Sequence, residues 1–462
     1  MRDIIITLMV FGAIPFVLMR PWLGILLFAW ISYMNPHRLT YGFAYNFQFA
    51  LIAALVTMVG VALSQEKKQV PATPVTIMLL IFVLWTALTT VFAYAPEEAN
   101  DQFIKFIKIQ LMTVLTLMMI NTRQRINWLV IFIVFSLGFY GVRGGIFSIM
   151  TGGNYRVWGP PGSFFEDNNQ LALTLIMTLP MMHYLQLISA NRWIRHGFSV
   201  MMLLTLGAII GTYSRGALVA LTMMGFALWL RSSRKLPVMF AATVCIVGVL
   251  SFMPQKWFDR MDTINSYEED ESASGRIDSW IFAINVANEH VLGGGFKVNT
   301  RSDIWPIFNP DAFKPRAPHS IYFEVLGEHG WIGLAMFLGI GVIAVFTCRS
   351  TEKLVRGRPD LKWAGDLSKM LSVSLVGYAA AGAFLNLATF DLYYHVLAII
   401  VLTRVCAKRA LAEPVPEDVR AQMAAADTPG GPAAPDGTAG EQPDAAAGRE
   451  LGGASGYLIR RR

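Results

Sequence analysis

Residues 315–347 read PRAPHSIYFEVLGEHGWIGLAMFLGIGVIAVFT. The stretch begins in a polar segment, passes His319 where that segment ends, and continues as a largely apolar run over residues 323–347. A run of about 20 apolar residues is long enough to cross a bilayer as a helix. The stretch therefore predicts a membrane-spanning helix that starts beside a titratable imidazole.

Similar apolar runs recur as far as residue 405, and only 15% of the 462 residues are charged, whereas soluble domains have about 25%. The chain is therefore predicted to be an all-α polytopic membrane protein, since a β-barrel would show short alternating segments. We expect about 12 transmembrane helices, because 22–34 is short for a crossing, and its status decides the side of the N-terminus. The predicted spans are residues 3–19, 22–34, 47–64, 74–94, 103–120, 127–148, 169–190, 196–213, 215–230, 237–253, 323–347, 368–386 and 389–405.

The net charge of +7 raises the question of nucleic-acid binding, which the placement of the basic residues argues against. They gather in alternate short loops, for example at Arg125, Arg231 and Arg358. This is the positive-inside pattern of membrane proteins, which places these loops in the cytoplasm. The segments 149–168 and 254–322 are then expected to face outward.

The composition divides the chain into a transmembrane domain over 1–409, with one large outer loop over 254–322, and a tail over 410–462. The tail is rich in Ala, Pro and Gly, and it has too little apolar surface to offset the entropy of ordering. We expect it to be a disordered cytoplasmic segment. The three cysteines are far apart and show no disulfide or metal-binding spacing.

The outer loop is predicted to contain a short amphipathic helix, because Ile277, Trp280, Ile281 and Ile284 recur at helical spacing. Ser272 or Ser274 would cap it. Such a helix lies on the membrane surface or over a cavity, or it packs on the bundle for stability alone. Gly293-Gly294-Gly295 then breaks the chain, and alone it is weak evidence for phosphate binding.

Four arginines on the predicted outer side are candidates for binding an anion: Arg143 and Arg215 near the outer ends of spans, and Arg156 and Arg276 in the outer loops. An arginine inside a membrane segment is costly and is a functional candidate by default, while the competing interpretation is a side chain that reaches to the interface. Arg276 opens the predicted loop helix, where a helix N-terminus and a planar guanidinium suit phosphate. The alternative is an exposed arginine that pairs with the acidic run over 268–271.

His319 is the candidate general base, because neutral imidazole can take a hydroxyl proton near neutral pH. A structural histidine at the membrane border is the competing interpretation. Glu324 either holds the imidazole or binds backbone groups nearby, and Glu328-His329-Gly330 is typical of a tight turn. Without a metal-binding carboxylate motif, arginines would have to stabilise a pyrophosphate leaving group.

Several of these segments resemble the O-antigen ligase superfamily, which includes O-antigen ligases, polymerases and protein O-oligosaccharyltransferases. The similar elements are SRGA at 214–217, GRIDSW at 275–280, PHSIYFEVLGEHGWIG at 318–333 and RVWGPPGSFFEDNNQLAL at 156–173, which includes Asn169. Ser320 stands where many members have Asn. Residues 20–52 resemble the branch of putative O-glycosylation ligases associated with exosortase A.

The resemblance implies a membrane glycosyltransferase of the GT-C type in the bacterial inner membrane, with its active site facing the periplasm. Its donor would be a glycan on undecaprenyl pyrophosphate, bound by Arg215 and Arg276 and, less securely, by Arg143 and Arg156. His319 would activate the acceptor hydroxyl, with Glu324, Glu328 and Asn169 as supporting residues. The transfer would be inverting, independent of metal and without a cofactor.

The leading function is en bloc transfer of the glycan to lipid A–core. A protein O-glycosylation ligase and an O-antigen polymerase share the donor chemistry and differ only in the acceptor. A transporter of lipid-linked sugars is a second class, which would be expected to bury charge near the midplane and to show repeats. A membrane scaffold is a third, and it would tolerate loss of His319 or Arg215.

Overall fold

A computed structural model describes residues 1–232, 235–262, 271–310, 315–415, 417 and 419–420. The chain divides into two units, residues 1–414 and 415–462. Every long helix that the structure describes lies in the first unit. Most of the predicted disordered tail lies outside the described residues, as do most of the acidic residues over 268–271 proposed as partners of Arg276.

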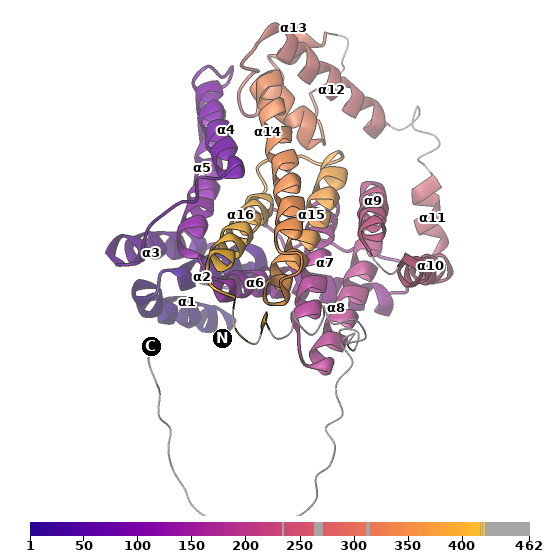
Figure 1. Cartoon of the computed structure of the whole chain (residues 1–462). Coiled ribbons are helices and arrows are strands. Elements are labelled where there is room, and N and C mark those ends of the chain that lie inside the picture. Colours follow the sequence, from indigo (N-terminus) through magenta and orange to yellow (C-terminus); the bar gives the residue numbers. More distant parts are fainter. Residues whose placement is uncertain (233–234, 263–270, 311–314, 416, 418, 421–462) are drawn as a thin grey trace, which may run out of the picture. The chain divides into compact units, whose positions relative to one another are not determined.

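Helices joined by loops make up the described part of the first unit, which contains no strand (Figure 1). The long helices are α1 (Arg2–Met19), α2 (Trp22–Met34), α3 (Phe49–Leu63), α4 (Pro74–Val91), α5 (Pro96–Met119), α6 (Arg123–Met150), α7 (Asn168–Ile188), α8 (Arg192–Gly211), α9 (Arg215–Arg231), α10 (Lys235–Phe252), α14 (Ile321–Leu354), α15 (Lys362–Gly382) and α16 (Asp391–Ala412). Each corresponds to one predicted span, and the prediction of an all-helical polytopic membrane protein is confirmed.

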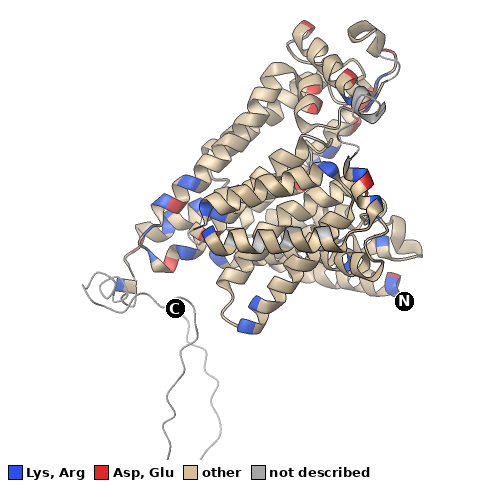
Figure 2. Cartoon of the chain, turned by 90° about the vertical axis from the view of Figure 1, so that its right-hand side faces the viewer, with Lys and Arg blue, Asp and Glu red and all other residues tan. Residues whose placement is uncertain are grey.

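Within the described residues, seven helices combine at least 18 residues with enough hydropathy to cross a membrane: α1, α4, α5, α6, α7, α8 and α14. The helices α2 and α3 are apolar but shorter. The total of about 12 crossings and the GT-C fold stay predictions. Figure 2 shows long helical stretches without charge and coloured charged residues mostly at their ends.

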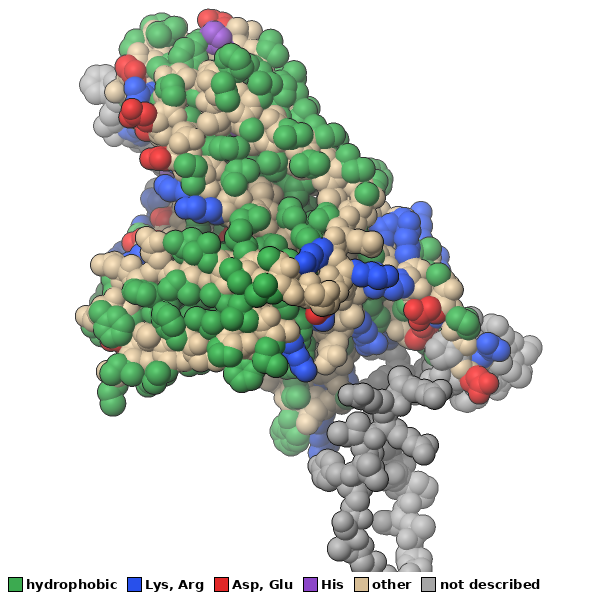
Figure 3. Space-filling view, turned by 90° about the vertical axis from the view of Figure 1, so that its left-hand side faces the viewer, with side chains coloured by type: hydrophobic (Ala, Val, Ile, Leu, Met, Phe, Trp, Pro, Cys, Tyr) green, Lys and Arg blue, Asp and Glu red, His purple; other side chains and the backbone are tan. Residues whose placement is uncertain are grey.

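Apolar side chains also cover much of the outer surface of the helices. On α4, Leu80 and Leu84 are 59% and 62% exposed, and Figure 3 shows hydrophobic side chains over much of one face. Lipid is a solvent for such a surface, whereas water is not. This exposure agrees with a protein that lies in a bilayer.

The closest helix pair joins α6 to α8 through glycines. Gly141 and Gly145 form a small-xxx-small spacing, and a side chain at Gly145 would collide with the carbonyl oxygen of Leu204. Glycines at this spacing let helix backbones approach closely in membranes. Arg143 stands between them and is exposed on the face turned away from this contact.

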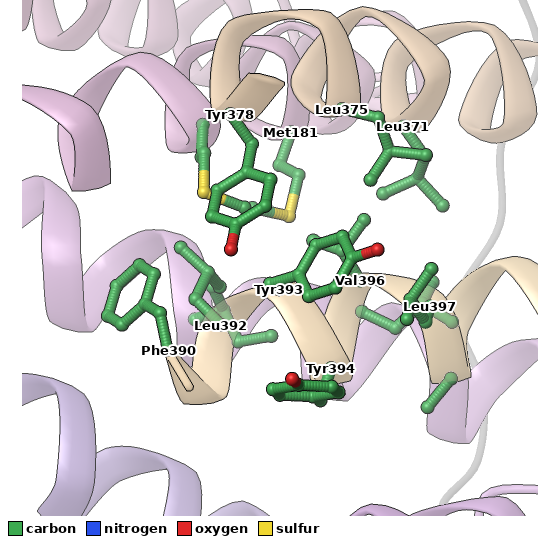
Figure 4. Packing of buried hydrophobic residues seen from close by; sticks show 14 of the residues in the cluster. Met181, Leu371, Leu375, Tyr378, Phe390, Leu392, Tyr393, Tyr394, Val396 and Leu397 are labelled. Atoms are coloured by element: carbon green, nitrogen blue, oxygen red, sulfur yellow. The ribbon is translucent and has the colours of Figure 1, made fainter. Parts of the chain in front are cut away.

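The core behind the candidate site is aromatic and lies between α7, α15 and α16. The ring of Tyr378 stacks on that of Tyr393 at 4.4 Å, and Met181 lies close by (Figure 4). The hydroxyl of Tyr378 donates to the carbonyl of Leu387 at 2.9 Å. The core thereby fixes the loop 383–390, which reaches the site described below.

The loops between helices gather at two ends of the helical body. At the basic end, Arg125 donates to Glu66 at 2.6 Å, and Arg409 donates to the carbonyl of Asn121 at 3.3 Å. At the other end, called the loop end here, the backbone N–H of Tyr94 donates to the carbonyl of Gly294 at 3.0 Å. Segments far apart in sequence are therefore joined at the same end.

The start of α1 lies at the loop end. Arg2 and Arg156 line the same cavity, and Arg156 belongs to the loop between α6 and α7. If the basic end faces the cytoplasm, α1 therefore begins on the outer side. The shared cavity thus indicates on which side of the membrane the N-terminus lies, which the short span 22–34 left open.

The large loop contains α11 (Gln255–Asp262), α12 (Glu271–Glu289), η3 (Val298–Thr300) and α13 (Trp305–Phe308). The helix α12 is the predicted loop helix, but it buries a different face. Phe282 and Val286 pack on Trp305 and Phe308 in a small core, whereas Ile277 and Ile281 are 45% and 42% exposed.

The prediction that Arg276 stands at the start of this helix is wrong. The helix begins at Glu271, so Arg276 lies in its second turn. Ser272 and Ser274, the predicted caps, are also inside the helix, and their side chains lie outside the described residues. Residues 271–274, Glu-Ser-Ala-Ser, include no strong helix breaker, so the helix extends N-terminally beyond Arg276.

Candidate active site

The segment that carries His319 is held from two sides. On one side, Trp280 Nε1 of α12 donates to the carbonyl of Pro318 at 2.9 Å, and its ring stacks on Phe323 at 4.7 Å. On the other side, the N–H of Ser320 donates to Asn386 Oδ1 at 3.2 Å. The histidine between them is exposed. Its position is therefore fixed while its ring stays accessible.

His319 adopts a left-handed backbone conformation, with φ of 45°. Few residues other than glycine take this conformation, which costs about 1–3 kcal/mol when the surroundings impose it. Tyr213, two residues before Arg215, also has a positive φ, of 59°. Strained residues cluster at functional sites, and these two stand next to candidate residues in sequence.

His319 lies in the electric field of Arg276 and Asp167. Partial burial and, next, the Arg276 guanidinium lower the pKa of His319 from its ordinary value of 6.5, while the Asp167 carboxylate acts in the opposite direction. A lowered pKa keeps the imidazole neutral at neutral pH. A neutral imidazole is the form that accepts a proton.

Asp167 is a site residue that the sequence reasoning missed. It precedes α7 and caps it, because its Oδ1 accepts from the backbone N–H of Asn169 at 2.8 Å. The side chain of Asn169, the residue that was predicted, donates to the same oxygen at 3.0 Å. The available signal was an aspartate directly before an apolar helical run. Asn169 therefore orients Asp167.

Arg215 is the first residue of α9, and it is half-buried. Ser214 caps this helix by accepting from the N–H of Ala217 at 3.2 Å. The arginine thus stands at a helix N-terminus, which favours anions. The arrangement expected of Arg276 is found at Arg215.

Two contacts connect Arg215 to the His319 segment. A Cβ atom at Gly216 would lie 2.9 Å from the ring of Phe384, and Phe384 belongs to the same loop as Asn386, which binds Ser320. The side chain of Asn168 also donates to the carbonyl of Thr212 at 2.7 Å. The start of α9 therefore packs against both the loop 383–390 and the start of α7.

Arg143 and Arg156 line a different space. It is a cavity of about 1260 Å³ whose lining also includes Arg2 and Arg38, and it is called the arginine cavity here. Arg215, Arg276 and His319 are not in its lining. Arg156 connects the arginine cavity to the start of α9, because its Cζ atom lies 6.0 Å from the centre of the ring of Tyr213.

Glu324 is half-buried and Glu328 is buried, and the carboxylates of both accept hydrogen bonds from the backbone. Glu324 Oε2 accepts from the N–H of Ala388 at 3.1 Å, and Glu328 Oε1 accepts from the N–H of Lys297 at 2.9 Å. Glu324 was expected either to hold the imidazole of His319 or to bind backbone groups. In the structure it binds the backbone. Both residues support the site by tying loops to α14.

The turn at Gly330 and the glycine run have packing roles. Gly330 kinks α14, with φ of 69° and ψ of −175°. The N–H groups of Gly294 and Gly295 donate to the carbonyls of Gly327 and Glu328 at 2.8 and 2.9 Å. A side chain on Gly293 would collide with this kink. The run thus permits a close backbone approach.

Comparison with known families finds separate matches for two segments of the chain. Residues 200–338 match the family model described as O-antigen ligase. The chain carries an O-antigen ligase domain. The domain includes Arg215, Arg276 and His319, and the predicted superfamily is confirmed, whereas the exosortase-associated branch stays a prediction.

Residues 1–190 match a second family model, described as a family of unknown function (DUF5935). This segment precedes the ligase domain and contributes all four arginines of the arginine cavity, as well as Asp167 and Asn169. Among curated proteins, no significant match to the chain was found. The ligase domain and the segment before it therefore each contribute basic residues to the loop end.

Proposed function

We propose that this protein is a GT-C-type glycan ligase of the bacterial inner membrane. It transfers a glycan en bloc from undecaprenyl pyrophosphate to a hydroxyl of lipid A–core on the periplasmic face. The observation that carries the proposal is the accessible His319, whose segment is fixed by Trp280 and Asn386, within a stretch that matches the O-antigen ligase family. The charges of Arg276 and Asp167 act on its imidazole.

The chemistry follows from the residues at this place. Neutral His319 takes the proton from the acceptor hydroxyl as its oxygen forms a bond to the anomeric carbon. The bond from that carbon to the phosphate oxygen breaks, and the configuration inverts. The pyrophosphate leaves with both electrons, and Arg215 and Arg276 offset its growing charge. Asp167 stabilises the imidazolium that forms.

Arginines supply the positive charge that a divalent metal supplies in other transferases, so the proposed reaction is independent of metal and needs no cofactor. A guanidinium stays protonated at any physiological pH and binds two phosphate oxygens at once. The start of α9 adds a helix N-terminus to Arg215. The attraction of the guanidinium groups and of the helix N-terminus for the leaving group grows as negative charge develops on it.

An apolar cavity beside the site suits the lipid part of the donor. It has a volume of about 280 Å³, and its lining begins at Ile321 and Tyr322 and continues along α14 to Phe346. Ile321 is two residues from His319. The first isoprene units of a polyprenyl chain in this cavity would leave the pyrophosphate at the loop end.

Transfer with purified components tests the proposal. The protein, a lipid-linked glycan donor and lipid A–core are mixed without ATP or an ion gradient, and the product is separated by size. We expect transfer by the wild type and none by His319→Ala or Arg215→Ala. Full transfer by both variants would refute the assignment of the site.

A deletion strain tests the acceptor. Loss of long-chain lipopolysaccharide while the lipid-linked glycan persists supports lipid A–core. Unaltered lipopolysaccharide together with unglycosylated protein would instead favour a protein O-glycosylation ligase, and shortened glycan chains would favour a polymerase. All three outcomes keep the donor chemistry and change only the hydroxyl that His319 activates.

A further inference from the structure

We propose that the arginine cavity is a second anion site, which binds a phosphate-bearing sugar of an acceptor glycolipid. The cavity is built from segments before residue 162, outside the ligase domain. The inference rests on the proposed function only where it names the ligand as the acceptor. It assigns a binding role to the segment of residues 1–190.

The cavity concentrates positive charge without an internal counterion. Its lining contains Arg2, Arg38, Arg143 and Arg156 and no aspartate or glutamate. None of the four forms an ion pair with a residue that the structure describes. A cavity lined by one sign of charge attracts and concentrates ligands of the opposite sign.

Two carboxylates next to residues of the cavity lining, Asp3 and Glu166, accept hydrogen bonds from the backbone. Asp3 Oδ1 accepts from the N–H groups of Gly42 and Ala44, both at 3.1 Å. Glu166 Oε2 accepts from the N–H of Gly162 at 2.8 Å. These bonds shape the walls of the cavity and leave its arginines to an external anion.

The guanidinium of Arg38 and the backbone that carries Arg143 are held in place before any ligand arrives. Arg38 donates to Asn46 Oδ1 at 3.2 Å and lies over the ring of Tyr45 at 4.7 Å. Arg143 projects from the part of α6 that glycines lock against α8. A guanidinium held in this way offers a planar fork to phosphate at little further entropic cost.

The size and the walls of the cavity favour a sugar over a bare phosphate. Pockets for drug-sized ligands have volumes of about 300–1,000 Å³, and this one is larger, at about 1260 Å³. Aromatic rings of Tyr41, Tyr45 and Trp158 also line it. Rings beside a few charged groups suit a ligand with both flat apolar faces and anionic substituents.

The position of the cavity favours the acceptor over the donor. The loop between α6 and α7 begins near Arg156, beside Tyr213, and ends at Asp167, whose charge acts on His319. Donor and acceptor must meet at His319 from different sides. With Arg215 and Arg276 assigned to the donor pyrophosphate, the arginine cavity is the remaining basic site next to the same centre.

Binding to the full-length protein in nanodiscs of phosphatidylcholine tests the inference. The probes are bis-phosphorylated lipid A and its dephosphorylated form. We expect Arg38→Ala and Arg143→Ala each to weaken binding of the phosphorylated probe about tenfold or more, because each loses a charge-assisted contact. Arg143→Lys should retain part of the affinity, and the dephosphorylated probe should bind weakly to every variant.

Arg20→Ala is the matched control, because Arg20 is an exposed arginine between α1 and α2 and does not line the cavity. Equal binding of both probes would overturn the proposal. So would equal competition by phosphatidylglycerol, which would identify the site as one for bulk anionic lipid. The assay measures binding alone, so a failed transfer reaction would refute the proposed function without affecting this result.

Discussion

Two arginines at the basic end of the helices, Arg125 and Arg231, are paired with carboxylates, whereas those of the arginine cavity are not. Arg125 donates to both oxygens of Glu66, at 2.6 and 3.0 Å, and Arg231 binds Glu352 at 3.0 Å. At the loop end, four arginines share one cavity that has no acidic lining residue. Paired arginines anchor helices, while a cavity lined only by arginine is suited to an anionic ligand. Substitutions at the two ends should therefore have different consequences.

The largest effect is expected from His319→Ala, which removes the proposed base at the loop end. General-base catalysis contributes about 10²–10⁴-fold, so transfer should fall by at least that factor in an assay with saturating donor and acceptor. His290→Ala is the control, because His290 is also exposed at this end and its ring bonds to the hydroxyl of Tyr94. Equal losses in both variants would show that the effect is not specific to His319.

Arg276→Ala should reduce kcat by about 10²–10³-fold, the range for loss of one transition-state contact. It should also change the pH profile. Arg276 helps to lower the pKa of His319, so its removal raises that pKa and moves the acidic limb of kcat/KM to higher pH. Measurement of kcat/KM between pH 5 and pH 8 checks this sign. A limb that stays in place would argue against His319 as the group that titrates.

Arg143→Ala should change acceptor binding and leave donor binding intact. We expect the KM for a phosphorylated acceptor to rise about tenfold, the effect of about 1.4 kcal/mol of lost binding energy, with the KM for the donor unchanged. Initial rates with each substrate varied in turn separate the two values. A parallel rise in the KM for the donor would instead place Arg143 at the pyrophosphate, as the sequence first suggested.

Arg125→Ala should have the smallest effect on transfer. The side chain forms charge-assisted bonds with Glu66 and a bond to the carbonyl of Met119 at 2.8 Å, so its loss should destabilise the protein by about 1–3 kcal/mol. Thermal unfolding in detergent measures the loss, and the activity of the folded fraction should stay near that of the wild type. A strong loss of activity in folded protein would contradict the assignment of a purely structural role to the paired arginines of the basic end.

Helix positions were predictable because hydrophobic length is a local property. Each long helix follows from an apolar run of its own, and the bounds differ from the predicted spans by a few residues in most cases. The errors lie where local signals compete. In α12, the apolar pattern of Ile277 and Ile281 identified a helix but not its buried face, since Phe282 and Val286 find partners in α13.

The candidate site was predictable only in part. His319 and Arg215 stand at visible junctions between polar and apolar sequence. Asp167 was missed, because its relation to His319 depends on how α7 packs beside the loop end. Glu324 was left with two roles, and only its bond to Ala388, 64 residues away, decides between them.

The sequence alone determined that this is a helical membrane protein, where its helices lie and which superfamily it resembles, because these follow from the length, periodicity and order of local segments. Only the tertiary structure decided which arginines share a space. Arg2, Arg38, Arg143 and Arg156 are separated by up to 154 residues and meet because α1, η1 (Pro36–Leu39) and α6 converge at one end. Such convergence depends on long-range packing, which no local pattern encodes.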